Sequence, residues 1–148
     1  MPLEINGFIE YSTYQSILER EEESTWQAWM DISSIIDYVD EFTEYLFGYS
    51  KRVIKDNIQI NALAKDRNIP KNPSDLVQRE LNFIRESERV YGEETFGYTF
   101  AYYNEIMSKY NKEFDTKEWN NLFSLIDKFL IMKNINSDQV RFIVWFSW

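Results

Sequence analysis

The sequence predicts a single α+β domain over residues 1–148, in which a small antiparallel sheet packs with three or four helices, mainly on one face. Two observations favour this class. Three segments, two near the N-terminus and one at the C-terminus, have the alternating or densely apolar character of strands. Between them, apolar residues recur at the spacing of amphipathic helices. A chain of 148 residues can bury roughly two-thirds of its unfolded surface in one core.

The two N-terminal segments have the two-residue period of half-buried strands. The first, LEINGFIEY at Leu3–Tyr11, places Ile5 and Ile9 on one face and Glu10 on the other. The second, TWQAWMDIS at Thr25–Ser33, alternates in the same way after the polar run EREEES. We expect the two strands to pair as a hairpin with a long connection.

From Ser33 onward the apolar period becomes helical. This first predicted helix has Ser34 and Asp37 in a capping arrangement, and it ends at Gly48, where a left-handed residue is favoured. Its opposite face carries acidic side chains.

Two further helices follow the same logic. One, DLVQRELNFIRESERVY, has Ser74 as its N-cap and Gly92 as its stop signal. The other starts at Asp115, with Glu118 three residues on, and extends to Lys133. In each of these helices, the apolar residues form a single stripe.

Two stretches have no decided period. Residues 51–73 contain RNIPKNPSD, whose two prolines predict irregular structure. Residues 93–110 leave two interpretations open: a short strand over Thr95–Phe100, and a helix around Tyr102–Tyr110.

The last segment, VRFIVWFSW, is apolar on both sides. One face carries Val140, Phe142, Val144, Phe146 and Trp148, and the other carries Arg141, Ile143, Trp145 and Ser147. This pattern is typical of an interior strand, because an exposed edge of this kind would promote aggregation. We expect it between the first two strands, or beside one of them and under the helices.

Composition and charge exclude several classes of protein. No run approaches the roughly 18 apolar residues of a membrane span, and the start does not resemble a secretory signal. On this ground no membrane contact is expected. Cysteine is absent, which rules out disulfides and suits a cytoplasmic protein. Residues 1–50 hold eleven acids and one base, Arg20. With a net charge of −9 overall, direct nucleic-acid binding is not expected.

The chain also lacks histidine, which removes the common nucleophile and zinc chemistries. Its four glycines are scattered, so there is no phosphate-binding loop. Pairs of carboxylates arise by chance among 25 acids. We therefore expect a protein without catalytic activity, cofactor or metal, and a carboxylate-based hydrolase stays as an alternative.

Bases and tyrosines gather in the undecided stretches, where loops can carry binding residues. Tyrosine rings stack on nucleobases and arginines fork onto phosphates. The predicted ligand-binding residues are Arg52, Arg67, Asp66, Tyr45, Tyr98 and Tyr102. The alternatives are that the aromatic residues belong to the core and that the bases pair with surface acids.

The acidic first third offers a second hypothesis. Closely spaced carboxylates can imitate a phosphate backbone and occupy a basic partner. The predicted partner surface consists of Glu21, Glu22, Glu23, Asp37, Glu41 and Glu44. The simpler interpretation is a solvated acidic face.

Several segments together resemble a family of small, mostly uncharacterised accessory proteins of bacteriophages and prophages. The segments are INGFIEY, TWQAWMDIS, DEFTEYLFGYSKR, LAKDRNIPKNPSD and VRFIVWFSW. The matching positions are Leu46, Phe47, Gly48, Arg52, Asp66, Arg67 and Pro70. The chain departs from the family in a longer stretch between Gly48 and Asp66, and in lacking a histidine within Thr95–Tyr103.

This resemblance implies a phage accessory protein acting in an infected or lysogenic bacterial host. Such proteins often counter host defence. The first hypothesis is therefore sequestration of a nucleotide-like small-molecule signal. The alternatives are an acidic inhibitor of a basic host protein and a virion component, with the oligomeric state left open.

Overall fold

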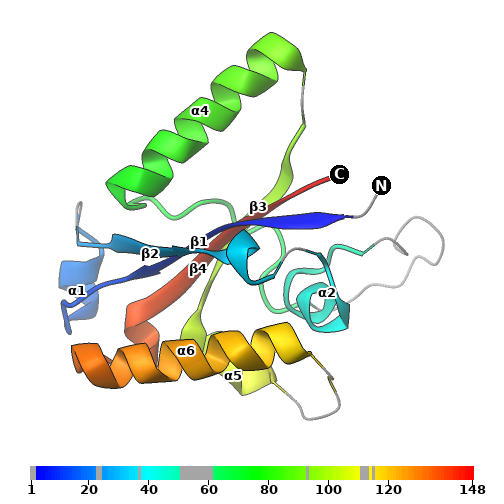
Figure 1. Ribbon diagram of the computed structural model, residues 1–148. Coiled ribbons are helices and arrows are strands. Elements are labelled where there is room, and N and C mark those ends of the chain that lie inside the picture. Colours follow the sequence, from blue (N-terminus) through cyan, green and yellow to red (C-terminus); the bar gives the residue numbers. More distant parts are fainter. Residues whose placement is uncertain are drawn as a thin grey trace.

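The structure, a computed structural model, describes residues 3–22, 25–36, 38–50, 62–92, 94–110, 114 and 116–148. These residues form one four-stranded antiparallel sheet with helices on both faces (Figure 1). The strands are β1 (Glu4–Tyr11), β2 (Gln27–Asp31), β3 (Phe96–Tyr102) and β4 (Val140–Ser147). The helices are α1 (Ile17–Arg20), α2 (Glu41–Phe47), α4 (Asp75–Tyr91), α5 (Tyr103–Lys109) and α6 (Lys117–Lys133), with 3-10 turns η1 (Ile32–Ser34) and η2 (Ser137–Gln139). The predicted α+β class is confirmed.

The C-terminal strand β4 lies in the interior of the sheet, whose order is β2-β1-β4-β3. It pairs with β1 along its whole length, from Glu4↔Ser147 to Tyr11↔Val140. The predicted interior position is therefore confirmed. Of its two expected places, the one between the first two strands is wrong, because β2 lies on the outer side of β1 and β3 covers the other edge of β4. The other, beside one of these strands and under the helices, is confirmed by the pairing with β1.

The described part of the undecided stretch, residues 94–110, contains both of the structures that the sequence left open. The segment Phe96–Tyr102 is strand β3, and the chain enters α5 directly at Tyr103. The predicted hairpin of β1 and β2 is also present, with a bulge between Ile9 and Glu10.

The alternation of β4 divides the molecule into two apolar layers. Its first face lies over α2, α5 and α6, with Val140, Phe142, Val144 and Phe146 buried in the main core. Its second face contacts α4 in a smaller cluster of Ile143, Trp145, Val77 and Leu81. Helices α2, α5 and α6 therefore cover one face, and α4 lies on the other, as Figure 1 shows.

The helix ends follow capping chemistry, with one correction. The predicted start of the first helix near Ser34 is wrong, because Ser34 belongs to η1 and α2 begins only at Glu41. The Asp40 carboxylate accepts a hydrogen bond from Thr43 N–H at 2.8 Å and is the effective N-cap, while Asp37 lies outside the described residues. Gly48 ends α2 in the left-handed conformation, as expected.

The other predicted caps are at the ends of α4 and α6. Ser74 Oγ accepts a hydrogen bond from Val77 N–H, and Gly92 ends α4 at a φ of 71°, so both predictions are confirmed. The expected cap Asp115 lies outside the described residues. The described part of the predicted irregular stretch, residues 62–73, contains no helix or strand.

Candidate ligand-binding site

A buried ion pair joins the two central strands. Glu10 on β1 and Arg141 on β4 lie opposite each other in the strand register. The Arg141 Nε–H donates to Glu10 Oε1 at 2.7 Å, and both side chains are almost fully buried. Arg141 is the single charged residue of β4, and charges buried this deeply need a partner of opposite sign.

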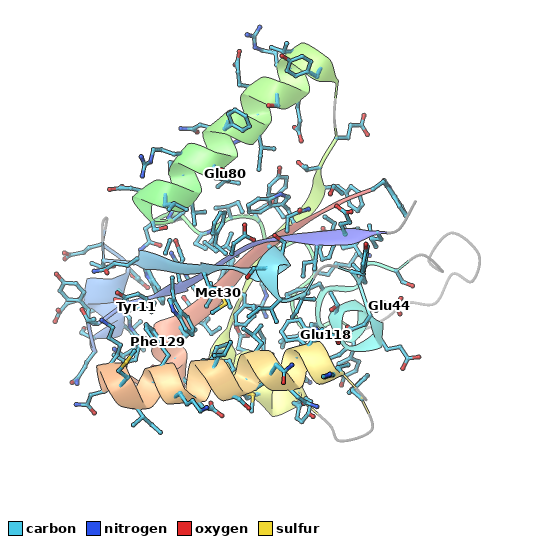
Figure 2. All side chains as sticks on the ribbon, viewed as in Figure 1. Tyr11, Met30, Glu44, Glu80, Glu118 and Phe129 are labelled. Atoms are coloured by element: carbon cyan, nitrogen blue, oxygen red, sulfur yellow. The ribbon has the colours of Figure 1, made fainter. Side chains whose placement is uncertain are left out.

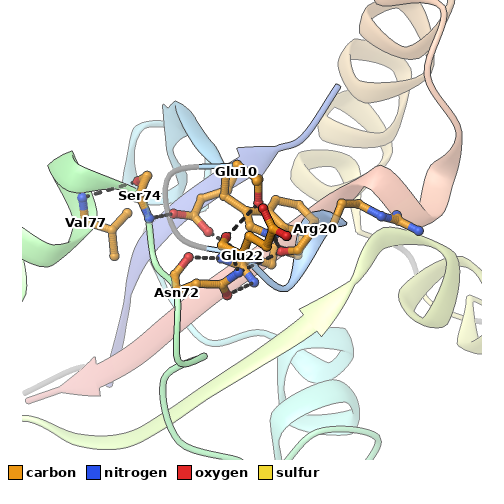
Figure 3. A network of polar contacts seen from close by, with 9 residues as sticks. Glu10, Arg20, Glu22, Asn72, Ser74 and Val77 are labelled. Carbon is orange, nitrogen blue, oxygen red and sulfur yellow. Dashed lines mark hydrogen bonds and ion pairs between the residues drawn. The ribbon is translucent and has the colours of Figure 1, made fainter. Parts of the chain in front are cut away.

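The remaining polar atoms of this pair are also satisfied. Glu10 Oε2 accepts from Ser74 N–H at 2.6 Å, and the Arg141 guanidinium donates to the Asn72 carbonyl at 2.9 Å. The guanidinium also lies 3.9 Å from the centre of the Trp26 ring. The pair thereby fixes the segment that begins α4 onto the sheet (Figure 3).

Arg20, the last residue of α1, extends this network. Its carbonyl accepts hydrogen bonds from Thr25 Oγ1, Trp26 Nε1 and Asn72 Nδ2 at 2.7–3.0 Å. Its guanidinium donates to Asp138 in η2, at 2.6 Å to the carbonyl and 3.2 Å to the carboxylate. Buried Nε is without a hydrogen-bond partner among the described residues. Segments distant in sequence are thus held together around one short helix.

These segments enclose a pocket of about 330 Å³. This volume is within the range of small-molecule sites, about 300–1,000 Å³. The lining residues are Ile17, Arg20, Glu21, Trp26, Asn72, Tyr102, Asn104, Glu105, Asp138 and Arg141. We call this cavity the α1 pocket.

The α1 pocket combines aromatic surface with polar groups. The Tyr102 ring is half-buried, and its centre is 6.2 Å from that of Trp26. Trp26 is itself buried, with the Arg141 guanidinium over its ring, so Tyr102 supplies the accessible aromatic surface. Asn104 adds an exposed side-chain amide at the start of α5.

The electrostatics of the pocket favour hydrogen-bond donors. Two guanidiniums and three carboxylates line it, but both guanidiniums are buried and engaged with carboxylates. The more accessible charges are those of Glu21, Glu105 and Asp138. A phosphate placed deep in the pocket would meet these carboxylates, whereas an amino group would find acceptors.

Glu105 is itself held by a forked ion pair. Arg67 donates through both terminal nitrogens to the two carboxylate oxygens, each at 3.0 Å, and Tyr102 N–H donates at 3.1 Å. Burial acts to raise the pKa of Glu105, but these hydrogen bonds and the Arg67 charge outweigh it and lower the pKa below its usual value. Glu105 is therefore an ionised acceptor at neutral pH.

The structure separates the predicted ligand-binding residues. Tyr102 lines the α1 pocket, and Arg67 lies behind it, committed to Glu105. Tyr98 is on the same sheet face but stacks on Trp145, 5.8 Å between ring centres. Asp66 accepts a hydrogen bond from Tyr49, at 2.5 Å.

Two more of the predicted residues do not reach this pocket. Tyr45 is on α2, where it packs against Phe114, on the opposite side of the sheet from α4. Arg52 lies outside the described residues.

The predicted acidic partner surface is divided as well. Glu21 and Glu22 follow α1, beyond the end of β1, whereas Glu41 and Glu44 belong to α2, near the start of β1. Figure 1 shows these two helices at opposite ends of the sheet. Glu23 and Asp37 lie outside the described residues, so the described acids do not form one continuous surface.

Sequence reasoning did not select most of the pocket residues. Arg20 is distinctive in the sequence, because it is the single base among residues 1–50. Arg141 also stands out, as the single charge in the apolar segment of β4, whereas Glu10 lies on the polar face of its alternating segment and does not. Asn72 and Asn104 carried no signal that distinguishes them from ordinary surface amides.

Neither metal binding nor a membrane crossing is supported by the described part of the chain. Its acidic side chains form no group of three or more that could hold a metal ion. Within the described ranges, no helix combines the length and apolar character that a membrane crossing requires.

Comparison with known proteins found no matching family model, no matching curated protein and no matching solved structure.

Proposed function

We propose that the protein is a non-catalytic binding protein whose α1 pocket receives the base of a nucleotide-like small molecule. The observation that carries this proposal is the combination, in one cavity of about 330 Å³, of the Tyr102 ring with acceptor groups of Glu105 and Asp138. Stacking on an aromatic side chain contributes about 1–3 kcal/mol per base. The carboxylates and the Asn104 amide then select a base that offers amino hydrogens.

The same arrangement orients the ligand. Because the pocket walls expose carboxylates, the phosphates of a nucleotide would point outward, toward solvent. This orientation differs from the sequence-based hypothesis. There Arg67 binds the phosphate, whereas here the phosphate points to solvent and only the base enters the pocket. Arg67 instead positions Glu105, the acceptor for the base.

The biological setting is proposed from the phage-like segments of the sequence. A phage accessory protein that binds a nucleotide signal without turning it over would lower the signal's free concentration in the infected cell. Such sequestration needs affinity and abundance, and no catalytic group.

Isothermal titration with nucleoside monophosphates, cyclic nucleotides and ADP-ribose derivatives tests the proposal. We expect adenine, cytosine or guanine compounds to bind more tightly than their uracil or hypoxanthine counterparts. Tyr102→Ala should weaken binding about tenfold or more through lost stacking. Tyr45→Ala, the same change on α2, serves as the matched control and should leave binding unchanged. Silence across the panel at high micromolar concentrations, or equal losses in both variants, would reject the α1 pocket.

A further inference from the structure

Helix α4 packs most closely on the sheet through its first half. Val77 and Leu81 are buried against Ile143 and Trp145 of β4. Further along the helix the apolar side chains emerge, and Phe83 is 68% exposed. Figure 1 shows α4 rising away from the sheet toward its C-terminal end.

A groove of about 790 Å³ occupies the space between this part of α4 and the sheet. We call it the α4 groove. Its lining includes the apolar side chains of Phe8, Phe83, Ile84, Trp145 and Trp148. Trp148 is 51% exposed, so two large aromatic side chains stand open to solvent on this groove. Exposed apolar surface of this kind, bordered by polar residues, is typical of interaction sites.

The border of the α4 groove is acidic. Four of its lining residues are Asp31, Glu80, Glu88 and Glu94, and within the described ranges no lysine or arginine lines the groove. Asp31 and Glu88 are fixed in place, since each carboxylate accepts a backbone N–H at 2.9 Å, from Ser33 and from Thr95 respectively. Figure 2 labels Glu80 on the helix wall. A concave surface lined by one sign of charge concentrates the opposite charge.

These features together select the occupant. A net charge of −9 opposes association of two copies of the chain, and it repels nucleic acid. A cationic segment is attracted to the carboxylates, and an apolar side chain on it can enter between Phe83 and Trp148. We propose that the α4 groove docks a basic segment of a partner protein that carries an aromatic or large aliphatic anchor. This site is separate from the α1 pocket and does not depend on ligand binding there.

Selection from a random library of displayed peptides about 12 residues long tests the chemistry of the partner. We expect the enriched sequences to combine lysine or arginine with tryptophan, phenylalanine or leucine. Binding of one enriched peptide, measured by fluorescence anisotropy, should weaken about tenfold in Phe83→Ala and in Glu80→Lys.

Two matched controls lie on α6, on the other side of the sheet. Ile131→Ala removes a similarly exposed apolar side chain, and Glu118→Lys makes the same change of net charge as Glu80→Lys. Both should leave peptide affinity within about twofold of wild type. Enriched sequences without an excess of basic residues, or equal losses in Glu80→Lys and Glu118→Lys, would overturn the proposal. So would a wild-type dimer in sedimentation that Phe83→Ala abolishes, because the groove would then serve a second copy.

Discussion

Replacing Glu10 with glutamine tests the buried ion pair without changing the volume of the side chain. Arg141 would keep its charge at 2% side-chain exposure but lose its carboxylate partner. In the wild type, Ser74 N–H donates to Glu10 Oε2 at 2.6 Å. In the variant, the amide oxygen of Gln can still accept from Arg141 Nε–H, but its NH₂ group would then face Ser74 N–H. Two donors would oppose each other in a buried site.

We expect Glu10→Gln to lower the free energy of unfolding by about 3–5 kcal/mol, the usual cost of removing one partner of a buried pair. Domains are stable by about 5–15 kcal/mol, so the loss should lower the melting temperature by roughly 10 °C. The double variant Glu10→Leu/Arg141→Met removes both charges, but leaves Ser74 N–H and the Asn72 carbonyl without these partners. It should therefore recover only part of the loss.

Urea unfolding followed by tryptophan fluorescence measures these differences. Glu86→Gln, which breaks the exposed Glu86–Arg89 pair on α4, is the control and should leave the midpoint unchanged. A loss below about 1 kcal/mol for Glu10→Gln would show that Arg141 does not depend on Glu10, because its charge would then be solvated or compensated elsewhere.

Three further predictions concern packing and pH. Gly7→Ala should destabilise the protein by more than about 3 kcal/mol in urea unfolding, because the new Cβ would lie 2.0 Å from the Ile143 carbonyl oxygen at a φ of 141°; a stable variant would contradict the β1–β4 register. Because the pKa of Glu105 is lowered in the folded state, its ion pair with Arg67 stabilises the protein at neutral pH and loses this effect as the pH falls through the folded-state pKa. The stability difference between wild type and Arg67→Ala should then shrink from about pH 6 to about pH 3, and a constant difference would contradict this pairing. Burial, followed by the hydrogen bond to Asp66 and the negative charge of Asp66, raises the pKa of Tyr49 to about 12. The stability of the protein should therefore fall as the pH rises from about 10 to 12. Tyr49→Phe should lessen this fall in denaturation curves at alkaline pH, and an equal fall in both proteins would exclude Tyr49 as its source.

Local patterns predicted β1, β2 and β4 and most ends of the predicted helices, because alternation and capping depend on neighbouring residues; β3 was left open between strand and helix. The two-sided apolar pattern of β4 correctly indicated an interior strand. It could not identify β3 as its neighbour, since that pairing joins Phe100 to Ile143 across the chain. The early helix start failed because Asp40 offers its own cap and Ser34 belongs to a 3-10 turn.

The candidate site was less accessible to sequence reasoning. Its residues come from α1, the segment before β2, the loop before α4, the β3–α5 junction, η2 and β4, and long-range packing alone brings them together. The predicted role of Arg67 shows the difficulty. An arginine in an irregular, basic stretch indicated phosphate binding, but Glu105, 38 positions away, occupies its guanidinium.

The most direct test of the α1 pocket is an NMR titration of the tryptophan indole N–H signals with the nucleotide that binds most tightly in calorimetry. Trp26 is the one tryptophan in the pocket lining, and its Nε1–H donates to the Arg20 carbonyl at 2.9 Å. Binding in the α1 pocket should shift the Trp26 signal, while the signals of Trp119 in the core and Trp148 in the α4 groove stay in place. Shifts confined to Trp145 and Trp148, or an unmoved Trp26 signal under saturation, would contradict it.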